Sequence, residues 1–217
     1  MRKVNLLKSL PETKRNIKKR SAGKSIEVIN EARKFGYMYW DGPREYGYGG
    51  YKYDGRWRSV ARDIIKHYSL KPGMKVLDIG CGKGFLVKDL IIECPGLDVF
   101  GIDISEYAIM NCEKEVIGRV SYGNAKSLLF PDSSFDCILS INVIHNLNKK
   151  EVEMALKEIV RVSKGMNFIQ VDSYLNVQEK IKFEEWVLTA EYHDYPEKWI
   201  KLFEKCGYNG DYFWTIV

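Results

Sequence analysis

The stretch KVLDIGCGKGF, residues 75–85, decides how this chain of 217 residues folds. A short apolar run leads into the glycine-rich turn GCGKG, and the following FLVKDL has the spacing of a helix. Glycines in such a turn allow positive φ angles and let a ligand approach the backbone without meeting a Cβ atom. The stretch therefore predicts a strand, a tight turn and a helix that together form a ligand-binding site.

Two classes of ligand fit a turn of this kind. A dinucleotide-binding turn has the pattern G-x-G-x-x-G with an acid about 20 residues later, and Asp103 stands at about that distance. However, Asp78 lies two residues before Gly80, and its carboxylate would repel a pyrophosphate held at the helix N-terminus. The residues therefore favour a ligand that is cationic beside Asp78.

Three motifs in order carry a family resemblance: VLDIGCGKG at 76–84, GIDIS at 101–105 and GNAKSLLFPDSSFDCILSINVIHNL at 123–147. They resemble the motifs of the class I S-adenosylmethionine (SAM)-dependent methyltransferases. The resemblance implies SAM as cofactor, with Asp78 near its methionine end and Asp103 accepting hydrogen bonds from both ribose hydroxyls. The cofactor-binding residues expected on this basis are Asp78, Gly80, Cys81, Gly82, Asp103, Ile104, Asn124, Ala125 and Ser140, with Asn142 as the alternative to Ser140.

Asn124 departs from the family pattern, because an acid usually stands beside the adenine ring. Its amide oxygen can still accept a hydrogen bond from the adenine amino group. We therefore expect SAM binding to survive this difference.

Strand and helix patterns alternate beyond residue 74, with expected strands at about 98–102, 119–122, 135–141 and 167–171. This alternation predicts an α/β fold with a doubly wound, mostly parallel sheet of six to seven strands and a ligand at the carboxyl ends of the strands. Only one clear strand follows residue 206, whereas the family usually ends in an antiparallel hairpin. The sheet edge left open could pair with another chain, so a homodimer is one expectation.

We divide the sequence into a basic, flexible arm (residues 1–24), a helical, aromatic-rich cover (25–73) and a SAM-binding core (74–217). The arm holds nine Lys and Arg and one acid, whereas the remainder holds 25 basic and 28 acidic residues. The charge of the body therefore predicts no extended basic surface for nucleic acid. Any contact with RNA would be made by the arm.

Residues 35–58, the aromatic segment of the cover, combine eight Tyr and Trp residues with arginines and glycines. Aromatic faces can stabilise a sulfonium by cation–π attraction, and arginines can clamp a carboxylate or phosphate. The alternative is that the rings only pack the cover onto the sheet. The expected substrate-binding residues, including one histidine from a later segment, are Tyr37, Tyr39, Trp40, Arg44, Tyr48, Tyr51 and His193.

Methyl transfer from a sulfonium is an in-line displacement that depends mainly on positioning in a dry pocket. A general base is needed only if the acceptor loses a proton early. His145, beyond the fourth core strand, and Asp172, at the end of the fifth, are the candidate catalytic residues. For both, a purely structural role is the alternative.

The remaining composition excludes several classes. Five scattered cysteines favour reduced thiols in a cytoplasm, three histidines without clustered acids predict no metal site, and no apolar run is long enough to span a membrane. We predict a SAM-dependent methyltransferase acting on an oxygen or nitrogen of a small polar, anionic metabolite resembling a sugar or an amino acid. The alternatives are an RNA or protein methyltransferase that uses the basic arm, and a non-catalytic SAM-fold partner subunit.

Overall fold

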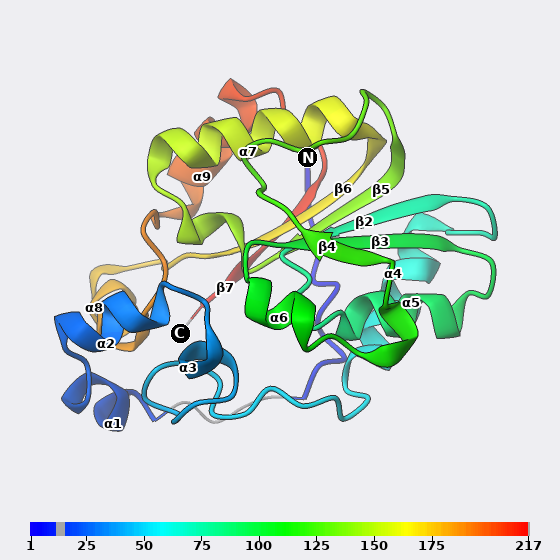
Figure 1. The fold of residues 1–217 in the computed structure, drawn as a ribbon. Helices are drawn as coiled ribbons and strands as arrows, with labels where there is room; N and C mark the ends of the chain where they lie inside the picture. Colours follow the sequence, from blue (N-terminus) through cyan, green and yellow to red (C-terminus); the bar gives the residue numbers. More distant parts are fainter. Residues whose placement is uncertain (12–15, 217) are drawn as a thin grey trace.

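The computed structural model describes residues 1–11 and 16–216, and seven strands in these residues form one sheet (Figure 1). Every neighbouring pair is parallel, and the strand order is β1-β7-β6-β5-β2-β3-β4. The strands are β1 (Arg2–Lys3), β2 (Lys75–Ile79), β3 (Asp98–Asp103), β4 (Val120–Tyr122), β5 (Phe135–Ile141), β6 (Ser163–Asp172) and β7 (Asp211–Thr215). The predicted doubly wound sheet is confirmed.

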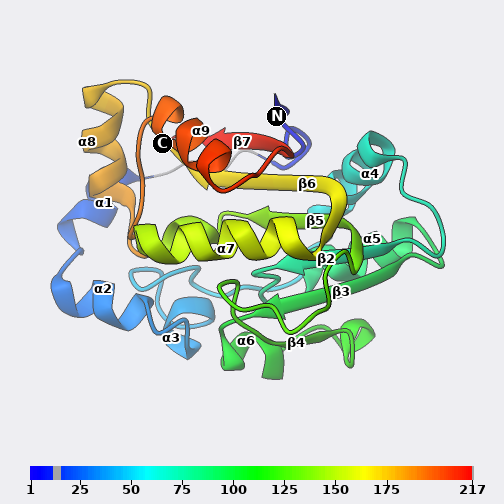
Figure 2. The same cartoon turned by 90° about the horizontal axis from the view of Figure 1, so that it is seen from above.

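Helices cover both faces of the sheet, which is why the central strands are apolar on both sides. Successive residues of β2 show this: Val76 packs on one face and Leu77 on the other, and both are fully buried. One face carries α7 (Lys149–Val162) and α9 (Pro196–Lys205), whereas the other carries α4 (Trp57–Tyr68) and α5 (Phe85–Glu93) (Figures 1 and 2).

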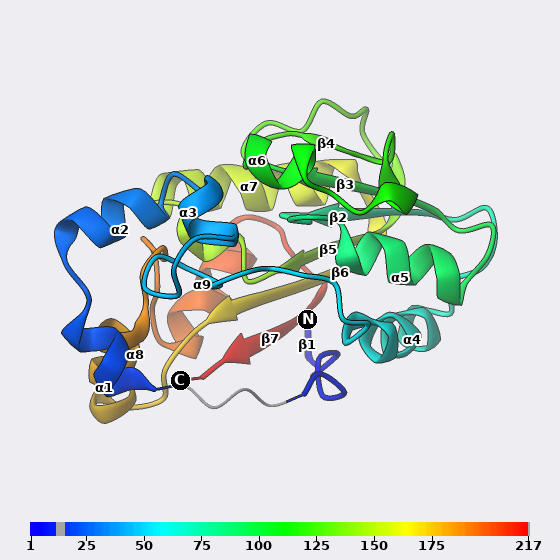
Figure 3. The same cartoon turned by 60° about the horizontal axis from the view of Figure 1, so that its bottom comes forward.

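The N-terminal helices gather at the carboxyl ends of the strands, together with one helix from the C-terminal part (Figure 3). These elements are α1 (Ile17–Ala22), α2 (Ile26–Ala32), α3 (Tyr37–Trp40) and α8 (Val177–Trp186). The part of the cover that precedes α4 therefore lies at the carboxyl ends of the strands, where the ligand of a doubly wound fold is expected.

The helix that follows β3 is short. The helix capped by Ser105, whose side chain accepts from the backbone N–H of Ala108, is α6 (Glu106–Met110), and a short 3₁₀ turn, η1 (Lys114–Val116), follows it. A second 3₁₀ turn, η2 (Ile144–Asn146), follows β5. α8 ends at Trp186, because Val187 takes an extended conformation.

The far edge of the sheet is completed in a way that the sequence did not indicate. β7 runs parallel to β6, and β1, from the other end of the chain, pairs with β7. Arg2 makes two hydrogen bonds of 2.9 Å to the carboxylate of Asp211, which also lies 2.6 Å from Nε2 of His67. β1 thus occupies the position beside β7 that we expected to be open to another chain.

The described residues of the predicted arm lie against the body. Leu6 is buried in the core on the α4 side, and Val4, Leu7 and Leu10 pack around it. α1 contacts α8. In residues 1–11 and 16–216, no helix is both long and apolar enough to cross a membrane.

Candidate functional site

The glycine turn, residues 80–84, follows β2 and is held against the neighbouring strand by its backbone. The N–H groups of Gly80 and Cys81 both donate to the carbonyl of Ile102, at 2.7 and 3.0 Å. Gly80, Gly82 and Gly84 all have positive φ, between 56° and 79°. A Cβ atom on Gly80 would lie 2.2 Å from the Val143 side chain, so glycine is required there by both conformation and space.

Asp103 ends β3, directly beside this turn. One carboxylate oxygen accepts from the N–H of Gly82 at 2.7 Å, and the other accepts from the N–H of Ser105 at 2.8 Å. Burial raises the pKa of Asp103, and these backbone hydrogen bonds act in the opposite direction. The carboxylate is therefore fixed in orientation, with accepting capacity left for a ligand.

Asp78 lies within β2 and is only 4% exposed. Burial, together with the nearby charge of Asp103, raises the pKa of Asp78 to about 8. A cationic ligand beside this residue would stabilise its charged form. The position of Asp78 is thus consistent with the cationic ligand that the sequence predicts.

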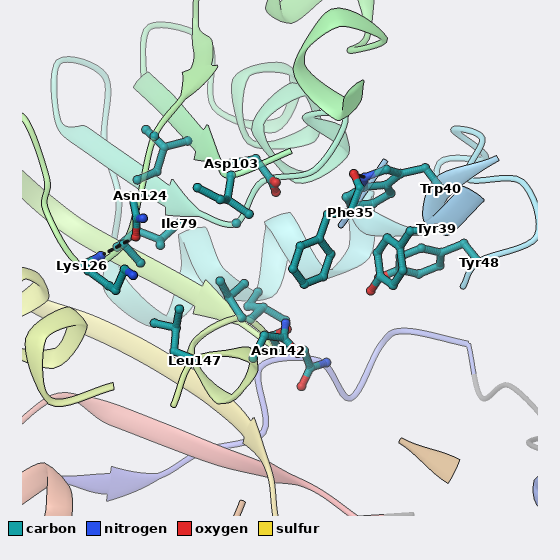
Figure 4. Close-up of a pocket in the computed structure, with 18 residues that line it drawn as sticks. Phe35, Tyr39, Trp40, Tyr48, Ile79, Asp103, Asn124, Lys126, Asn142 and Leu147 are labelled. Atoms are coloured by element: carbon teal, nitrogen blue, oxygen red, sulfur yellow. Dashed lines mark hydrogen bonds between the residues drawn. The ribbon is translucent and has the colours of Figure 1, made fainter. Parts of the chain in front are cut away.

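A cavity of about 220 Å³ opens at the carboxyl ends of β2, β3 and β5 (Figure 4). Rings from the cover stand on one side, Asn124 and Ile79 stand on the opposite side, and Asp103 lies between them. The lining residues are Phe35, Tyr39, Trp40, Tyr48, Ile79, Gly80, Ile102, Asp103, Ile104, Gly123, Asn124, Ala125, Lys126, Ile141, Asn142, Val143, Asn146 and Leu147.

This cavity brings together five of the nine predicted cofactor residues with three of the seven predicted substrate residues. The former are Gly80, Asp103, Ile104, Asn124 and Ala125, and the latter are Tyr39, Trp40 and Tyr48. Asp78 and Cys81 lie next to lining residues in the chain, and Gly82 lies two residues after Gly80. Ser140 is fully buried and does not line the cavity, whereas Asn142, its alternative, does.

The aromatic segment is held onto the glycine turn by specific contacts. The indole N–H of Trp40 donates to Ser105 Oγ at 2.8 Å, and a Cβ on Gly82 would lie 2.9 Å from the Trp40 ring. Asp41 accepts hydrogen bonds from Lys83 Nζ at 2.6 Å and from Tyr107 at 2.7 Å. We call these three residues, Asp41, Lys83 and Tyr107, the latch, because they join the cover to the turn and to α6.

The other predicted substrate residues lie outside the cavity. Tyr37 is 56% exposed and meets the edge of Tyr107, and Tyr51 stacks on Phe85. Arg44 donates to the carbonyl of Gly47 and lines a different cavity. His193 packs against Tyr174 and Phe183. These placements follow from packing among the rings, which the aromatic composition alone does not resolve.

The two candidate catalytic residues contact each other beside the cavity without lining it. His145 is 4% exposed, its Nδ1 accepts from the backbone N–H of Asp172 at 3.0 Å, and that nitrogen lies 3.5 Å from the Asp172 carboxylate. Burial lowers the pKa of His145. The ring is therefore neutral at pH 7 and supports the end of β6.

Several lining residues carried no sequence signal. Phe35 and Leu147 are apolar residues whose place depends on how two loops fold, and Asn146 lies in η2. Lys126 reaches the cavity wall, but its ammonium pairs with Glu151. Asn142, by contrast, was the sequence-based alternative to Ser140, and its φ of 57° is a left-handed conformation that asparagine tolerates at the end of a strand.

The arrangement fits a nucleoside with a cationic group. A buried acid at a strand end faces the cavity, the glycine turn has no room for side chains, and an acceptor amide and an apolar isoleucine stand where a base could lie. Among the described residues, no group of three or more His, Cys, Asp or Glu side chains could hold a metal ion. The fold and the cavity together therefore match the doubly wound, SAM-binding architecture that the sequence predicts.

Comparison with known proteins shows what the chain is similar to. Residues 77–166 match the model of the methyltransferase domain family. The chain is 34% identical over 128 residues to a sterol 24-C-methyltransferase of Gibberella zeae, covering 54% of this chain and 33% of that protein. It is 30% identical over 138 residues to a demethylmenaquinone methyltransferase of Symbiobacterium thermophilum, covering 59% and 54% of the two chains.

A solved structure agrees with this result. A SAM-dependent methyltransferase from Archaeoglobus fulgidus superposes with a TM-score of 0.54 at 25% identity, covering 69% of this chain and 68% of that one. Residues 77–166 therefore match a methyltransferase domain within a class I SAM-dependent methyltransferase fold, and these matches imply SAM as the cofactor. The chain spans between a third and about half of the length of the curated relatives described above.

Proposed function

We propose that this chain transfers a methyl group from SAM to a small-molecule acceptor held under the aromatic segment. The observation that carries the proposal is the placement of four rings, Phe35, Tyr39, Trp40 and Tyr48, on one side of the cavity, with Asn124 and Ile79 on the opposite side and Asp103 between them. SAM supplies a methyl group activated on a sulfonium. The rings and the strand ends would exclude water from the space between cofactor and acceptor.

The residues of the cavity divide the work between cofactor and acceptor. Asp103 and the glycine turn would hold the ribose and the methionine part, and Asn124 would accept from the adenine amino group. The carboxylate of Asp78, in the strand before the turn, would lie near the positively charged methionine end of SAM. The aromatic faces would then stabilise the sulfonium and stack against the acceptor.

The lining favours an acceptor with an apolar or aromatic body. The arginine expected to clamp an anion, Arg44, does not line this cavity, and the ammonium of Lys126 is paired with Glu151. The polar groups that remain are the amides of Asn142 and Asn146 and the hydroxyls of Tyr39 and Tyr48. We therefore infer a ring-bearing acceptor with one reacting oxygen or nitrogen, in place of the anionic metabolite. The names of the sterol and demethylmenaquinone methyltransferases support the ring-bearing body of the acceptor, although the sterol enzyme is named for methylation at carbon.

Proton removal is a minor part of the proposed reaction. Burial raises the pKa of Tyr39 well above its usual range, so this hydroxyl would donate a hydrogen bond and keep its proton. Neither His145 nor Asp172 lines the cavity, so a catalytic role for these two residues stays a prediction. The acceptor that suits this site is nucleophilic without early deprotonation, such as an amine or an ionised phenol or hydroquinone.

The experiment measures binding first and transfer second. Titration calorimetry with SAM and with NAD tests the cofactor, and tight NAD binding without SAM binding would contradict the proposal. Transfer of radioactive methyl from SAM is then measured to three panels: phenols and hydroquinones, sugar phosphates, and unmodified transfer RNA. Activity confined to the first panel supports the proposal, and activity confined to either other panel overturns the acceptor class.

A further inference from the structure

A second cavity of about 440 Å³ lies between the N-terminal helix α1, the loop that follows α3, and α8. It is distinct from the cavity beside Asp103, which we call the methyl-transfer cavity, and the two share no lining residue. Three of its eight lining residues are cationic and one is acidic. The residues are Asn16, Lys19, Arg20, Gly23, Pro43, Arg44, Glu45 and Trp186.

Two guanidinium groups converge in this cavity over one indole ring. The guanidinium carbon of Arg20 lies 4.9 Å from the centre of the Trp186 ring, and that of Arg44 lies 5.9 Å from it. Arg20 also donates to the carbonyls of Glu45 at 2.9 Å and Gly47 at 3.4 Å, and Arg44 donates to Gly47 as well. The ring and the carbonyls hold both side chains in place.

These two arginines have no anionic partner within the described part of the chain. No Asp or Glu carboxylate of residues 1–11 and 16–216 forms an ion pair with Arg20 or Arg44, whereas Arg2, Arg56, Arg62, Arg119 and Arg161 all have one. Burial and the charge of Arg44 lower the pKa of Arg20, which shows that the two like charges disfavour each other. An anion between them would relieve that repulsion.

The chemistry of the donors indicates which anion fits. Each guanidinium has five N–H donors, and the carbonyl contacts of Arg20 and Arg44 leave several of these for a ligand. Planar forks of this kind match the oxygens of phosphate, and Lys19 adds a third positive charge. We propose that this cavity is a phosphate-binding site that takes the phosphate or diphosphate group of a small molecule.

A single small ligand suits the site better than a polynucleotide. The site is a discrete cavity that includes an acid, Glu45, and the remainder of the body carries more acidic than basic residues. A polynucleotide requires a continuous positive track along its backbone.

Occupation of the site would act on the cover. Gly47, whose carbonyl binds both arginines, directly precedes Tyr48, and Tyr48 lines the methyl-transfer cavity. The N–H of Tyr48 in turn donates to the carbonyl of Tyr39 at 2.8 Å. A phosphate held by Arg20 and Arg44 therefore fixes the loop that carries one wall of the other cavity.

Calorimetric titration of the full chain with inorganic pyrophosphate, in the absence of SAM, tests the proposal. We expect measurable binding that weakens at least tenfold in Arg20→Gln and in Arg44→Gln. Arg56→Gln is the matched control, because Arg56 is exposed and already paired with Asp54, and its affinity for pyrophosphate should be unchanged. SAM affinity is measured on every variant and shows which of them keep the fold.

Three outcomes overturn the proposal: no binding of pyrophosphate at millimolar concentration, equal loss in the Arg56→Gln control, or unchanged binding in Arg44→Gln with its SAM affinity intact. A titration with single-stranded RNA at two salt concentrations addresses the other source of phosphate. Binding of RNA with a steep salt dependence, and no binding of pyrophosphate, would assign the basic residues to a polynucleotide instead. None of these results depends on finding the methyl acceptor.

Discussion

The two walls of the methyl-transfer cavity are built in different ways. The cofactor wall consists of a glycine turn and a strand-end acid held by backbone hydrogen bonds between β2 and β3. The acceptor wall consists of aromatic side chains on a short helix and loops, held by ring stacking and the latch. The first wall is fixed by the sheet itself, whereas the second can change without changing the fold. This difference explains how one fold can keep its cofactor while its acceptors vary.

The largest effect is expected from filling the cofactor wall. Gly80→Ala places a Cβ 2.2 Å from Val143 at a φ of 77°, so strain and overpacking together should cost about 2–5 kcal/mol of unfolding free energy. Gly118→Ala is the matched control, since its φ is 80° but no atom lies within 4 Å, and about 1 kcal/mol is expected. Urea titration measures both, and equal losses would show that the turn is not tightly packed.

The next effect concerns the acid beside the turn. Asp103→Asn removes the charge that would accept from the ribose hydroxyls, and we expect SAM affinity to fall about 10-fold to 100-fold. Asp98→Asn, on the same strand but paired with Arg119 at the surface, should leave the affinity unchanged. Titration calorimetry checks this, and an unaltered affinity in Asp103→Asn would remove the assignment of the cofactor wall.

Asp78 makes stability depend on pH. Its pKa of about 8 lies far above that of an unfolded aspartate, so the native state keeps a proton that the unfolded state has lost. The stability of the ligand-free chain should therefore fall as pH rises from about 4 to 8, by about 1–3 kcal/mol after allowance for relaxation around the buried group. In Asp78→Asn this fall should be absent. Denaturant titrations at several pH values compare the two, and parallel curves would contradict the raised pKa.

The latch offers a smaller change on the acceptor wall. The side chains of Lys83 and Asp41 are only 9% and 22% exposed, so Asp41→Asn should cost about 1 kcal/mol and weaken SAM binding about threefold to tenfold through a looser cover. Asp54→Asn breaks an exposed ion pair with Arg56 in the same segment and should have little effect. If limited proteolysis cuts both variants alike, the latch does not hold the cover.

The smallest effect is expected at His145. Because this side chain lies behind the cavity wall, His145→Gln should lower the rate of methyl transfer less than threefold, and the pH profile of the rate should keep its shape. Loss of a titration step from that profile would instead establish His145 as the base.

Sequence and structure agree best where backbone geometry decides the position. The glycine turn and Asp103 were predicted because their spacing after a strand leaves few alternatives, and most of them meet at one cavity. For the strand-end residue the sequence left Ser140 and Asn142 as alternatives, because a buried strand gives no sign of where the chain turns toward the ligand, and Asn142 is the one that lines the cavity.

The aromatic segment was harder to predict for a physical reason. Its rings have several partners of equal chemistry, so composition indicates a packed cover but not which rings face the ligand. Tyr51 and Tyr48 illustrate this. The centroids of their rings lie 4.4 Å apart, but only Tyr48 lines the cavity. Arg44 was expected at the acceptor for the same reason, and the structure places it in the second cavity.

The pairing of β1 with β7 has a consequence for how the chain reaches its native state. Arg2 and Asp211, which this pairing joins, are 209 positions apart in the sequence. During synthesis on the ribosome, β1 has no partner until the residues of β7 have also been made. Until the two strands pair, this edge of the sheet is open to association with other nascent chains.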